Sequence, residues 1–376
     1  MLAKIKKITA YIILNLLAIV IMFLIVEGLS SSVIVVRKIM SNKPLAERLH
    51  TKYDKDLGWI NIPNLYIKDM YGPDVYIKTN SQSFRNNQDF GGETPEGKMR
   101  IVCSGDSFTF GYGVDNDHAW CQLLVSHNPR IEAINMSQGG YGVDQAYLWF
   151  KRDSHTVNHD IHIFAFITDD FYRMENDTFL GYGKPFLSIE NDILVTKNVP
   201  VPKRPYYLPW ATDNLPIIKE LNVLELAGKL LLKKKFTVTQ SKVIHGEDNK
   251  KEIISAIFRD IKQINQGKNS IGVLLYLPTR YDYKKPLSQS WKQFLINEAS
   301  INGLFFIDLT DEFSKLPALN IEDLFIPDGT ISYSHAAGHY TEEGNRYIAD
   351  TLYKKMIDIS EISARLNKES YIERSE

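Results

Sequence analysis

Short apolar runs alternate with helix-like stretches along this 376-residue chain and limit the folds that are open to it. The runs lie at 100–105, 131–136, 161–167, 271–277 and 303–309. Their apolar residues are continuous rather than alternating, as in strands that are buried on both faces. Helix-like stretches lie between the runs and after the last one, at 117–127, 143–153, 249–266, 287–300 and 343–358. The alternation predicts an α/β fold with a doubly wound parallel sheet.

The composition excludes some classes of function. With 44 basic and 45 acidic residues, the formal net charge of -1 gives no electrostatic footprint for a nucleic-acid partner. Cys103 and Cys121 form neither a CxxC motif nor a Cys/His ligand spacing, so neither a structural metal site nor a disulfide framework is indicated. A single bridge between these two cysteines stays open. The length and the 44% hydrophobic content allow one large domain or two small ones.

The amino-terminal segment has the character of a membrane anchor. Lys4, Lys6 and Lys7 precede residues 8–26, which carry no charge. A helix of that length rises about 28 Å, close to the ~30 Å hydrocarbon core of a bilayer. A cleaved signal peptide also begins with lysines and an apolar run, but such runs usually end after about 7–15 residues. We therefore expect residues 1–40 to be an uncleaved, single-pass anchor, with the large domain on the non-cytoplasmic side.

The remaining chain divides by composition. Residues 41–95 are polar, contain Pro44 and Pro63, and are predicted to be a connecting arm and lead-in. Residues 96–360 form the main domain. Within it, 174–248 breaks the rhythm with "NVPVPKRPYYLPW" and "ELAGKLLLKKKF", and is predicted to be an insertion over the sheet's edge. Aromatics of "PYYLPW" either line an acyl or sugar site or pack on the domain. Residues 361–376 form a polar tail.

Chemically capable residues follow the predicted strands. In an open parallel sheet, ligands bind outside the carboxyl ends of the strands. Ser107 lies at such a corner, just after Asp106, although Ser or Asp at a corner also serves as an ordinary helix cap. His339 precedes the last helix, and glycines that admit close backbone approach follow the second strand: Gly139, Gly140 and Gly142. Together they supply a nucleophile, oxyanion donors and a base.

These segments resemble the blocks of the SGNH (GDSL-type) hydrolases. The similar blocks, in order, are "GDSFTFGYGV", "NMSQGGYG", "FITDDF" and "GHYTEEGNRYIA". "LGWINIPN" and "IKTNSQSFR" resemble the lead-in of a membrane-anchored bacterial subgroup, so the resemblance covers about residues 54–358. It implies a flavodoxin-like α/β fold and hydrolysis or transfer of an acyl group through a covalent serine intermediate. It implies no metal and no organic cofactor.

The resemblance also implies roles for single residues. Ser107 is the expected nucleophile and His339 the base that takes its proton. The backbone N–H groups of Ser107 and Gly140 are expected to hold the oxyanion of the tetrahedral intermediate. Asp106 is expected to be a structural residue that fixes the turn.

Two positions depart from the family pattern. Asp169 stands where the family has an Asn that donates to the oxyanion, and an ionised carboxylate cannot donate. We expect Asp169 to be either turned away or protonated, in which case it donates to the oxyanion itself. The acid that usually precedes the histidine is also missing, because residues 336–338 are Ala, Ala and Gly. Asp328 or a backbone carbonyl is the candidate to hold the ring instead.

Two functions of different class follow. The first is a membrane-anchored serine esterase or O-acyltransferase, hydrolysing or moving an ester-linked acyl group on an acylated carbohydrate or another envelope component. The second is a catalytically degenerate relative that binds a glycan or a partner protein. A lipase acting on membrane lipid is a third, weaker reading. Fluorophosphonate labelling distinguishes the first two, because only an activated serine reacts readily.

Overall fold

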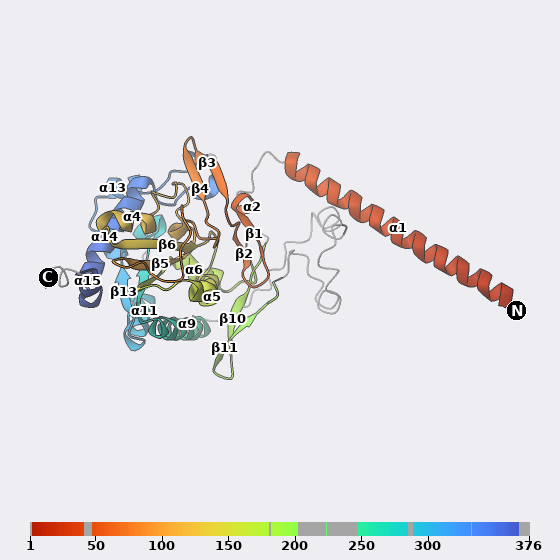
Figure 1. Cartoon of the computed structure of the whole chain (residues 1–376). Coiled ribbons are helices and arrows are strands. Elements are labelled where there is room, and N and C mark those ends of the chain that lie inside the picture. The colour runs from red at the N-terminus through yellow and green to blue at the C-terminus, as the bar shows by residue number, and fades with distance from the viewer. Residues whose placement is uncertain are drawn as a thin grey trace.

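The fold is described from a computed structural model that defines residues 2–40, 47–179, 182–201, 223, 247–284, 289–331 and 333–367. Helix α1 (Leu2–Met40) comprises the predicted anchor. Its stretch Lys4–Val33 is long and apolar enough to cross a membrane. The most apolar part of this stretch is not buried by the other described residues (Figure 1). A signal sequence shares these features, so the retained anchor stays a prediction.

A five-stranded parallel sheet forms the centre of the main domain (Figure 1). Its strands are β5 (Met99–Gly105), β6 (Ile131–Ser137), β7 (Ile161–Phe166), β12 (Ile271–Tyr276) and β13 (Phe305–Asp308). They are arranged in the order β13-β12-β7-β5-β6, and every neighbouring pair is parallel. Counted along the chain, this is the flavodoxin-like order 2-1-3-4-5, whose direction reverses between β5 and β7. The predicted strands and their parallel arrangement are confirmed.

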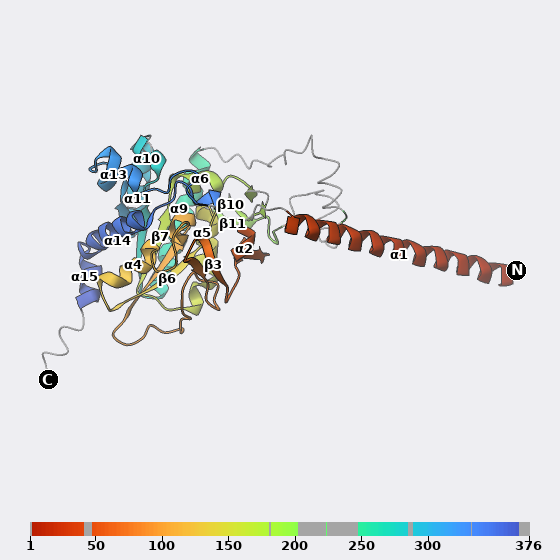
Figure 2. The same cartoon turned by 90° about the horizontal axis from the view of Figure 1, so that it is seen from above.

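Helices cover both faces of the sheet (Figures 1 and 2). One face packs against α5 (Val143–Asp153), α9 (Glu247–Gly267) and α11 (Gln289–Ile301). The other packs against α4 (Trp120–His127), α14 (Glu342–Ile357) and α15 (Ser360–Asn367). Along β5, Val102 belongs to the first core cluster, whereas its neighbours Ile101 and Cys103 belong to the second. Because strand side chains alternate between faces, continuous apolar runs feed both cores, and the predicted double winding is confirmed.

Short elements connect these layers. They are α2 (Glu47–His50), α3 (Ser107–Phe110), a 3₁₀ turn at Ser154–Thr156, α6 (Thr168–Arg173), α10 (Arg280–Lys284), α12 (Thr310–Phe313), α13 (Ala318–Asp323) and a 3₁₀ turn at Ser334–Ala336.

The lead-in differs from the connecting arm that the sequence suggested. It folds into two antiparallel hairpins, β1 (Thr51–Asp54) with β2 (Gly58–Asn61) and β3 (Tyr66–Gly72) with β4 (Val75–Lys78). The segment also contributes buried apolar residues to the first core cluster: Leu57, Trp59, Ile60, Phe84 and Phe90. Apart from the adjacent Trp59 and Ile60, these residues are scattered along the segment, so no periodic pattern marks them as core.

The described part of the insertion also forms two hairpins. They pair β8 (Thr178–Phe179) with β9 (Tyr182–Gly183) and β10 (Phe186–Glu190) with β11 (Ile193–Lys197). A fully buried ion pair fixes this segment to α5, with 2.5 Å between Lys184 Nζ and Asp144 Oδ2. The segments "PYYLPW" and "ELAGKLLLKKKF" lie outside the described residues.

The polar tail expected from residue 361 begins as a packed helix instead. Helix α15 buries Ile362 and Leu366 in the second core cluster. Arg130 holds its end by donating from Nη1 to the carbonyl of Leu366. Two apolar residues four positions apart were too weak a signal against a charged background.

Candidate active site

The structure brings Ser107 and His339 together at the carboxyl edge of the sheet. Ser107 begins α3 directly after β5, and His339 lies in the loop before α14. A hydrogen bond of 2.7 Å joins Ser107 Oγ to His339 Nε2. The pair lies at the end of β5, next to the point where the strand order reverses. Open α/β sheets place their ligand sites at such a point.

The strand-to-helix corner fixes Ser107. Asp106 is the N-cap of α3, and its Oδ1 accepts a hydrogen bond of 2.8 Å from the backbone N–H of Phe108. Gly105 has no room for a side chain, because a Cβ there would lie 2.4 Å from Thr109 Oγ1 and 2.8 Å from the carbonyl oxygen of Ala165. The structural role expected for Asp106 is therefore confirmed.

His339 is held by its backbone and by aromatic contacts. Its carbonyl accepts from Ile326 N at 2.8 Å, and its own N–H donates to the carbonyl of Ala336 at 3.0 Å. The imidazole stacks on Phe108 with 4.4 Å between ring centroids, and Tyr112 lies 5.2 Å away on a tilted plane. Aromatic packing thus orients the ring where the family would use an acid.

Two backbone donors face the same corner. No described residue accepts a hydrogen bond from the backbone N–H of Ser107 or of Gly140. Gly140 has a φ of 77°, a left-handed conformation that favours glycine. A Cβ there would also lie 2.5 Å from Phe179 Cε1. Position 140 therefore requires glycine for both its backbone conformation and its packing.

The lead-in holds this glycine corner in place. Trp59 Nε1 donates to the carbonyl of Gly139 at 3.0 Å, and Tyr141 Oη donates to the carbonyl of Trp59 at 2.5 Å. Gln138 Nε2 donates to Asn61 Oδ1 at 2.6 Å, and its Oε1 accepts from Gly139 N at 2.7 Å. The resemblance of "LGWINIPN" was the only sequence signal for this support.

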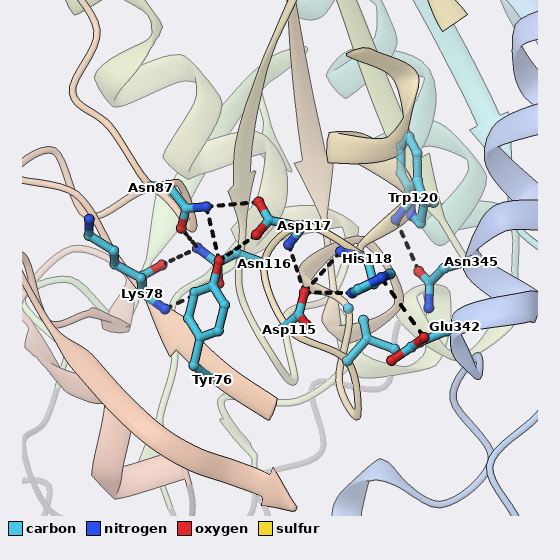
Figure 3. A network of polar contacts seen from close by, with 12 residues as sticks. Tyr76, Lys78, Asn87, Asp115, Asn116, Asp117, His118, Trp120, Glu342 and Asn345 are labelled. Carbon is cyan, nitrogen blue, oxygen red and sulfur yellow. Dashed lines mark hydrogen bonds and ion pairs between the residues drawn. The ribbon is translucent and has the colours of Figure 1, made fainter. Parts of the chain in front are cut away.

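A second network fixes the loop that follows α3 (Figure 3). Asn116 pairs with the backbone of Lys78, accepting from its N–H at 3.1 Å and donating to its carbonyl at 2.8 Å. Asp117 accepts from Tyr76 Oη at 2.7 Å and from Asn87 Nδ2 at 2.8 Å. These contacts tie hairpin β3–β4 to the loop that follows α3, the helix that Ser107 begins, and the sequence did not reveal them.

Arg85 adds to that support at the carboxyl end of α3. Its buried guanidinium donates to the carbonyls of Phe110, Gly111 and Val114. Because the last carbonyls of a helix have no partner within it, a cation there satisfies them and favours the helix dipole. "IKTNSQSFR" therefore contains a residue that holds the end of α3.

The other two predicted site residues do not join the serine and histidine. Asp169 lies in the first turn of α6, is exposed, and makes no hydrogen bond with any described residue. Asp328 is also exposed and makes none with His339 among the described residues. Their roles stay predictions, and the structure gives neither of them a partner at the reacting pair.

His339 has an unusual electrostatic environment. Its Nδ1 is buried and has no hydrogen-bond partner in the described part of the chain. The carbonyls of Ala336 and Ala337 approach closely enough to favour the protonated ring, without forming a well-aligned bond to Nδ1. Burial dominates and lowers the pKa of His339 from 6.5 to about 4, while Asp106 raises it and Arg173 lowers it. His339 is therefore neutral at physiological pH and able to accept a proton.

A buried ionic cluster adjoins the serine. Arg173 Nη1 donates to Asp106 Oδ2 at 3.0 Å and to Asp170 Oδ1 at 2.7 Å. Asp170 Oδ2 accepts from the N–H of Ile167 at 3.0 Å, which caps α6. Burial raises the pKa of Asp170 well above its usual range, and the charge of Asp106 raises it further. Sequence reasoning missed Arg173, because nothing in its neighbourhood marks it.

The described residues hold no cluster of three or more His, Cys, Asp or Glu side chains suited to a metal ion. Cys103 and Cys121 are both buried free thiols. The groups available for a reaction in this part of the chain are therefore a hydroxyl, a neutral imidazole, two backbone N–H donors and one guanidinium.

Comparison with known proteins finds similarity at the level of solved structures. No family model and no curated protein matches the chain. One similar structure is an acetyl xylan esterase, at 13% identity and a TM-score of 0.39, covering 69% of this chain and 100% of that one. Another is a member of the lipolytic G-D-S-L family from Veillonella parvula, at 15% identity and a TM-score of 0.34, covering 68% and 97%.

A psychrotrophic esterase from Pseudoalteromonas sp. is similar at 15% identity and a TM-score of 0.35, covering 68% of this chain and 94% of that one. The G-D-S-L family named for the Veillonella parvula structure is the family whose sequence blocks this chain resembles. At these TM-scores the similarity says nothing about activity. The chemistry of this chain is inferred from the geometry around Ser107.

The low pKa of His339 predicts the pH dependence of ester hydrolysis. Only the neutral ring accepts the proton of Ser107, and a lowered pKa keeps the ring neutral to lower pH. We expect kcat/KM, which reports the free enzyme, to rise with pH to a plateau with a midpoint of about 4. The measurement is kcat/KM between about pH 3.5 and 8. This range includes both the lowered pKa of about 4 and the ordinary histidine value of 6.5. A midpoint near the ordinary histidine value of 6.5 would show that the ring is not desolvated in solution.

Proposed function

We propose that this chain is a serine-dependent ester hydrolase. The observation that carries the proposal is the 2.7 Å hydrogen bond between Ser107 Oγ and His339 Nε2 at the strand edge where two backbone donors are free of described partners. A nucleophile in contact with a neutral base, next to oxyanion donors, is the arrangement that acyl transfer requires.

The reaction follows from these groups. Ser107 Oγ bonds to the ester carbonyl carbon while its proton passes to His339 Nε2. The N–H groups of Ser107 and Gly140 stabilise the oxyanion. When the intermediate collapses, the carbon–oxygen bond to the alcohol breaks and the imidazolium protonates the leaving oxygen. Water then attacks the acyl-serine with His339 again as base, which releases the acid and restores Ser107.

The substrate class is the finer part of the proposal. An acylated carbohydrate or another envelope component fits a domain tethered beside a membrane, and a second alcohol in place of water would make the protein an O-acyltransferase. Helix α1 and the resemblance of the sequence blocks support this assignment.

The acyl-serine intermediate gives the direct test. With 4-nitrophenyl acetate in excess, we expect a rapid release of about one nitrophenolate per chain before the steady state, as acylation outruns deacylation. A chain that shows neither burst nor turnover, yet is folded, would instead support a degenerate protein that binds a glycan or partner. The unpartnered Nδ1 of His339 is the feature that favours this second candidate.

The proposed location gives a separate prediction. If α1 is retained and the basic end stays inside, a reporter fused at residue 376 that is active only outside the cytoplasm will be active. Alkaline phosphatase activity of such a fusion, with a cytoplasm-dependent reporter as the matched control, checks this. The opposite pattern would reverse the orientation, and a mature chain that begins after residue 30 would show a cleaved signal sequence.

A further inference from the structure

Arg173 lies against both halves of the predicted oxyanion site. Its Nη1 donates at 3.0 Å to Oδ2 of Asp106, the residue directly before the Ser107 N–H. The same atom donates at 3.1 Å to the carbonyl of Tyr141, the residue directly after the Gly140 N–H. A single guanidinium thus bridges the residues that flank the two backbone donors.

The ring of Phe179 places the guanidinium beside Gly140 independently. Arg173 Cζ lies 5.4 Å from the centroid of that ring. An edge atom of this ring, Cε1, would meet a Cβ on Gly140 at 2.5 Å. Gly142 leaves space for the arginine, because a Cβ there would lie 3.1 Å from Arg173 Cβ. The glycine corner and Arg173 are therefore packed as one unit.

The guanidinium still has donors to offer. All of its hydrogen bonds with described residues use Nη1, whereas Nη2 and Nε donate to none of them. The side chain as a whole retains 17% exposure, so it is not fully enclosed by the core. An arginine is always protonated and has donors in a planar fork, which suits it to an oxygen anion.

The neighbouring charges require a cation at this point. Asp106 Oδ2 lies 3.3 Å from Ser107 Oγ, so its carboxylate adjoins the atom at which the tetrahedral intermediate forms. An uncompensated carboxylate at that distance would oppose the negative charge that develops on the substrate oxygen. Arg173 compensates it through the hydrogen bond from Nη1 to Asp106 Oδ2.

The other side chains of the block "FITDDF" cannot replace the asparagine amide that donates to the oxyanion in the resembled family. Thr168 Oγ1 is engaged with Tyr276 Oη at 2.6 Å and with Asp282 Oδ1 at 3.1 Å. Asp170 is buried and caps α6, and Asp169 is exposed and makes no hydrogen bond with a described residue, although its charge acts on Arg173. We propose that the guanidinium of Arg173 stabilises the oxyanion in place of the absent asparagine. This inference rests on the proposed ester hydrolysis and names the third group of its oxyanion site.

The test compares substitutions of Arg173 in the full-length chain on a chromogenic ester. Arg173→Gln is expected to lower kcat by about 10²- to 10³-fold, the usual effect of losing one oxyanion donor. KM should change by less than about threefold, because the interaction forms only in the transition state. Arg173→Lys keeps the charge but loses the fork, so we expect an intermediate loss of about tenfold.

Paired variants separate this role from a structural one. Arg173→Gln leaves two carboxylates facing each other, so Arg173→Gln combined with Asp170→Asn removes that repulsion and tests catalysis in a stable protein. Asp170→Asn alone removes the same ion pair but keeps the guanidinium, so it serves as the background against which the double variant is compared, and the double variant should be slower than it by about 10²-fold or more. A trifluoromethyl ketone, whose bound adduct carries an oxyanion, should lose affinity in the Arg173→Gln variants by the factor lost in kcat/KM.

The outcomes are distinct. A parent protein without Ser107-dependent turnover overturns the proposed function and this inference together. A parent that turns over, with Arg173→Gln at the same kcat, overturns the role of Arg173 alone. Equal kcat values for Asp170→Asn and for the Asp170→Asn/Arg173→Gln double variant would also overturn it, because they would trace the effect to the ionic cluster rather than to the guanidinium.

Discussion

Replacement of Ser107 with alanine is expected to lower kcat for ester hydrolysis by about 10⁶-fold, as in other enzymes that lose a serine nucleophile. The hydroxyl supplies the atom that forms the acyl intermediate, and it contacts His339 Nε2 at 2.7 Å and, at a longer distance of 3.3 Å, Asp106 Oδ2. Ser107 is buried at the start of α3 and the helix is capped by Asp106, so the fold does not depend on the hydroxyl. Steady-state turnover, with circular dichroism for folding, measures the effect.

A matched control lies three positions earlier in the chain. Ser104 Oγ also lies 2.7 Å from a histidine nitrogen, Nε2 of His162, but both side chains are fully buried in the sheet. Ser104→Ala leaves that nitrogen without its bond and should cost about 1–3 kcal/mol of stability, while kcat stays near that of the parent. A Ser107→Ala variant that keeps the rate of the Ser104→Ala control would remove Ser107 as the nucleophile.

Replacement of His339 with alanine is expected to lower kcat by about 10⁴- to 10⁶-fold, because Ser107 then has no base to accept its proton. Residues of a catalytic unit are not additive, so the double variant Ser107→Ala/His339→Ala should be no slower than the slower single variant. Turnover of the three variants, measured side by side, checks both statements.

His118 provides the comparison for His339. It is partly exposed and pairs with Asp115 at 2.8 Å in the loop network (Figure 3). His118→Ala should leave kcat within about threefold of the parent. If the losses from Ser107→Ala and His339→Ala multiply in the double variant, the two residues act separately and the assigned pair is wrong.

The sheet was predictable because burial on both faces leaves a strong local signature. The runs 100–105 and 161–167 correspond to Met99–Gly105 and Ile161–Phe166, with differences of one residue at the ends. The final strand is shorter than its run, Phe305–Asp308 against 303–309, because Leu304 and Leu309 are buried outside the strand pairing. Apolar continuity reports burial and not the exact extent of the ladder.

Part of the site was predictable for a different reason. Ser107 and Gly140 each follow a predicted strand, and parallel strands bring their carboxyl ends to one edge. His339 precedes α14, whose N-cap Thr341 accepts from Gly344 N. The topology therefore brings these three residues together before any side-chain contact is known.

Long-range support was not predictable. Arg173 and Asp106 are 67 residues apart, and Trp59 and Gly139 are 80 apart, yet each pair is joined by a hydrogen bond. No periodicity marks an isolated arginine or tryptophan as part of a site. Asp169 and Asp328 were singled out from the family pattern, and the structure shows both exposed, without a hydrogen bond to the serine or histidine. The positions of these two side chains depend on the tertiary fold, which the family pattern does not report.

The most direct test of an activated serine is a fluorophosphonate probe, with the adduct located by mass spectrometry. The phosphorus bonds to Ser107 Oγ, fluoride leaves, and the proton passes to His339, so labelling needs both residues but no knowledge of the natural substrate. We expect one adduct per chain, on Ser107, formed quickly by the parent and by Ser104→Ala, and lost in Ser107→Ala and His339→Ala. A folded parent that stays unlabelled, or that carries the adduct on another residue, would contradict the assignment of Ser107 as the nucleophile.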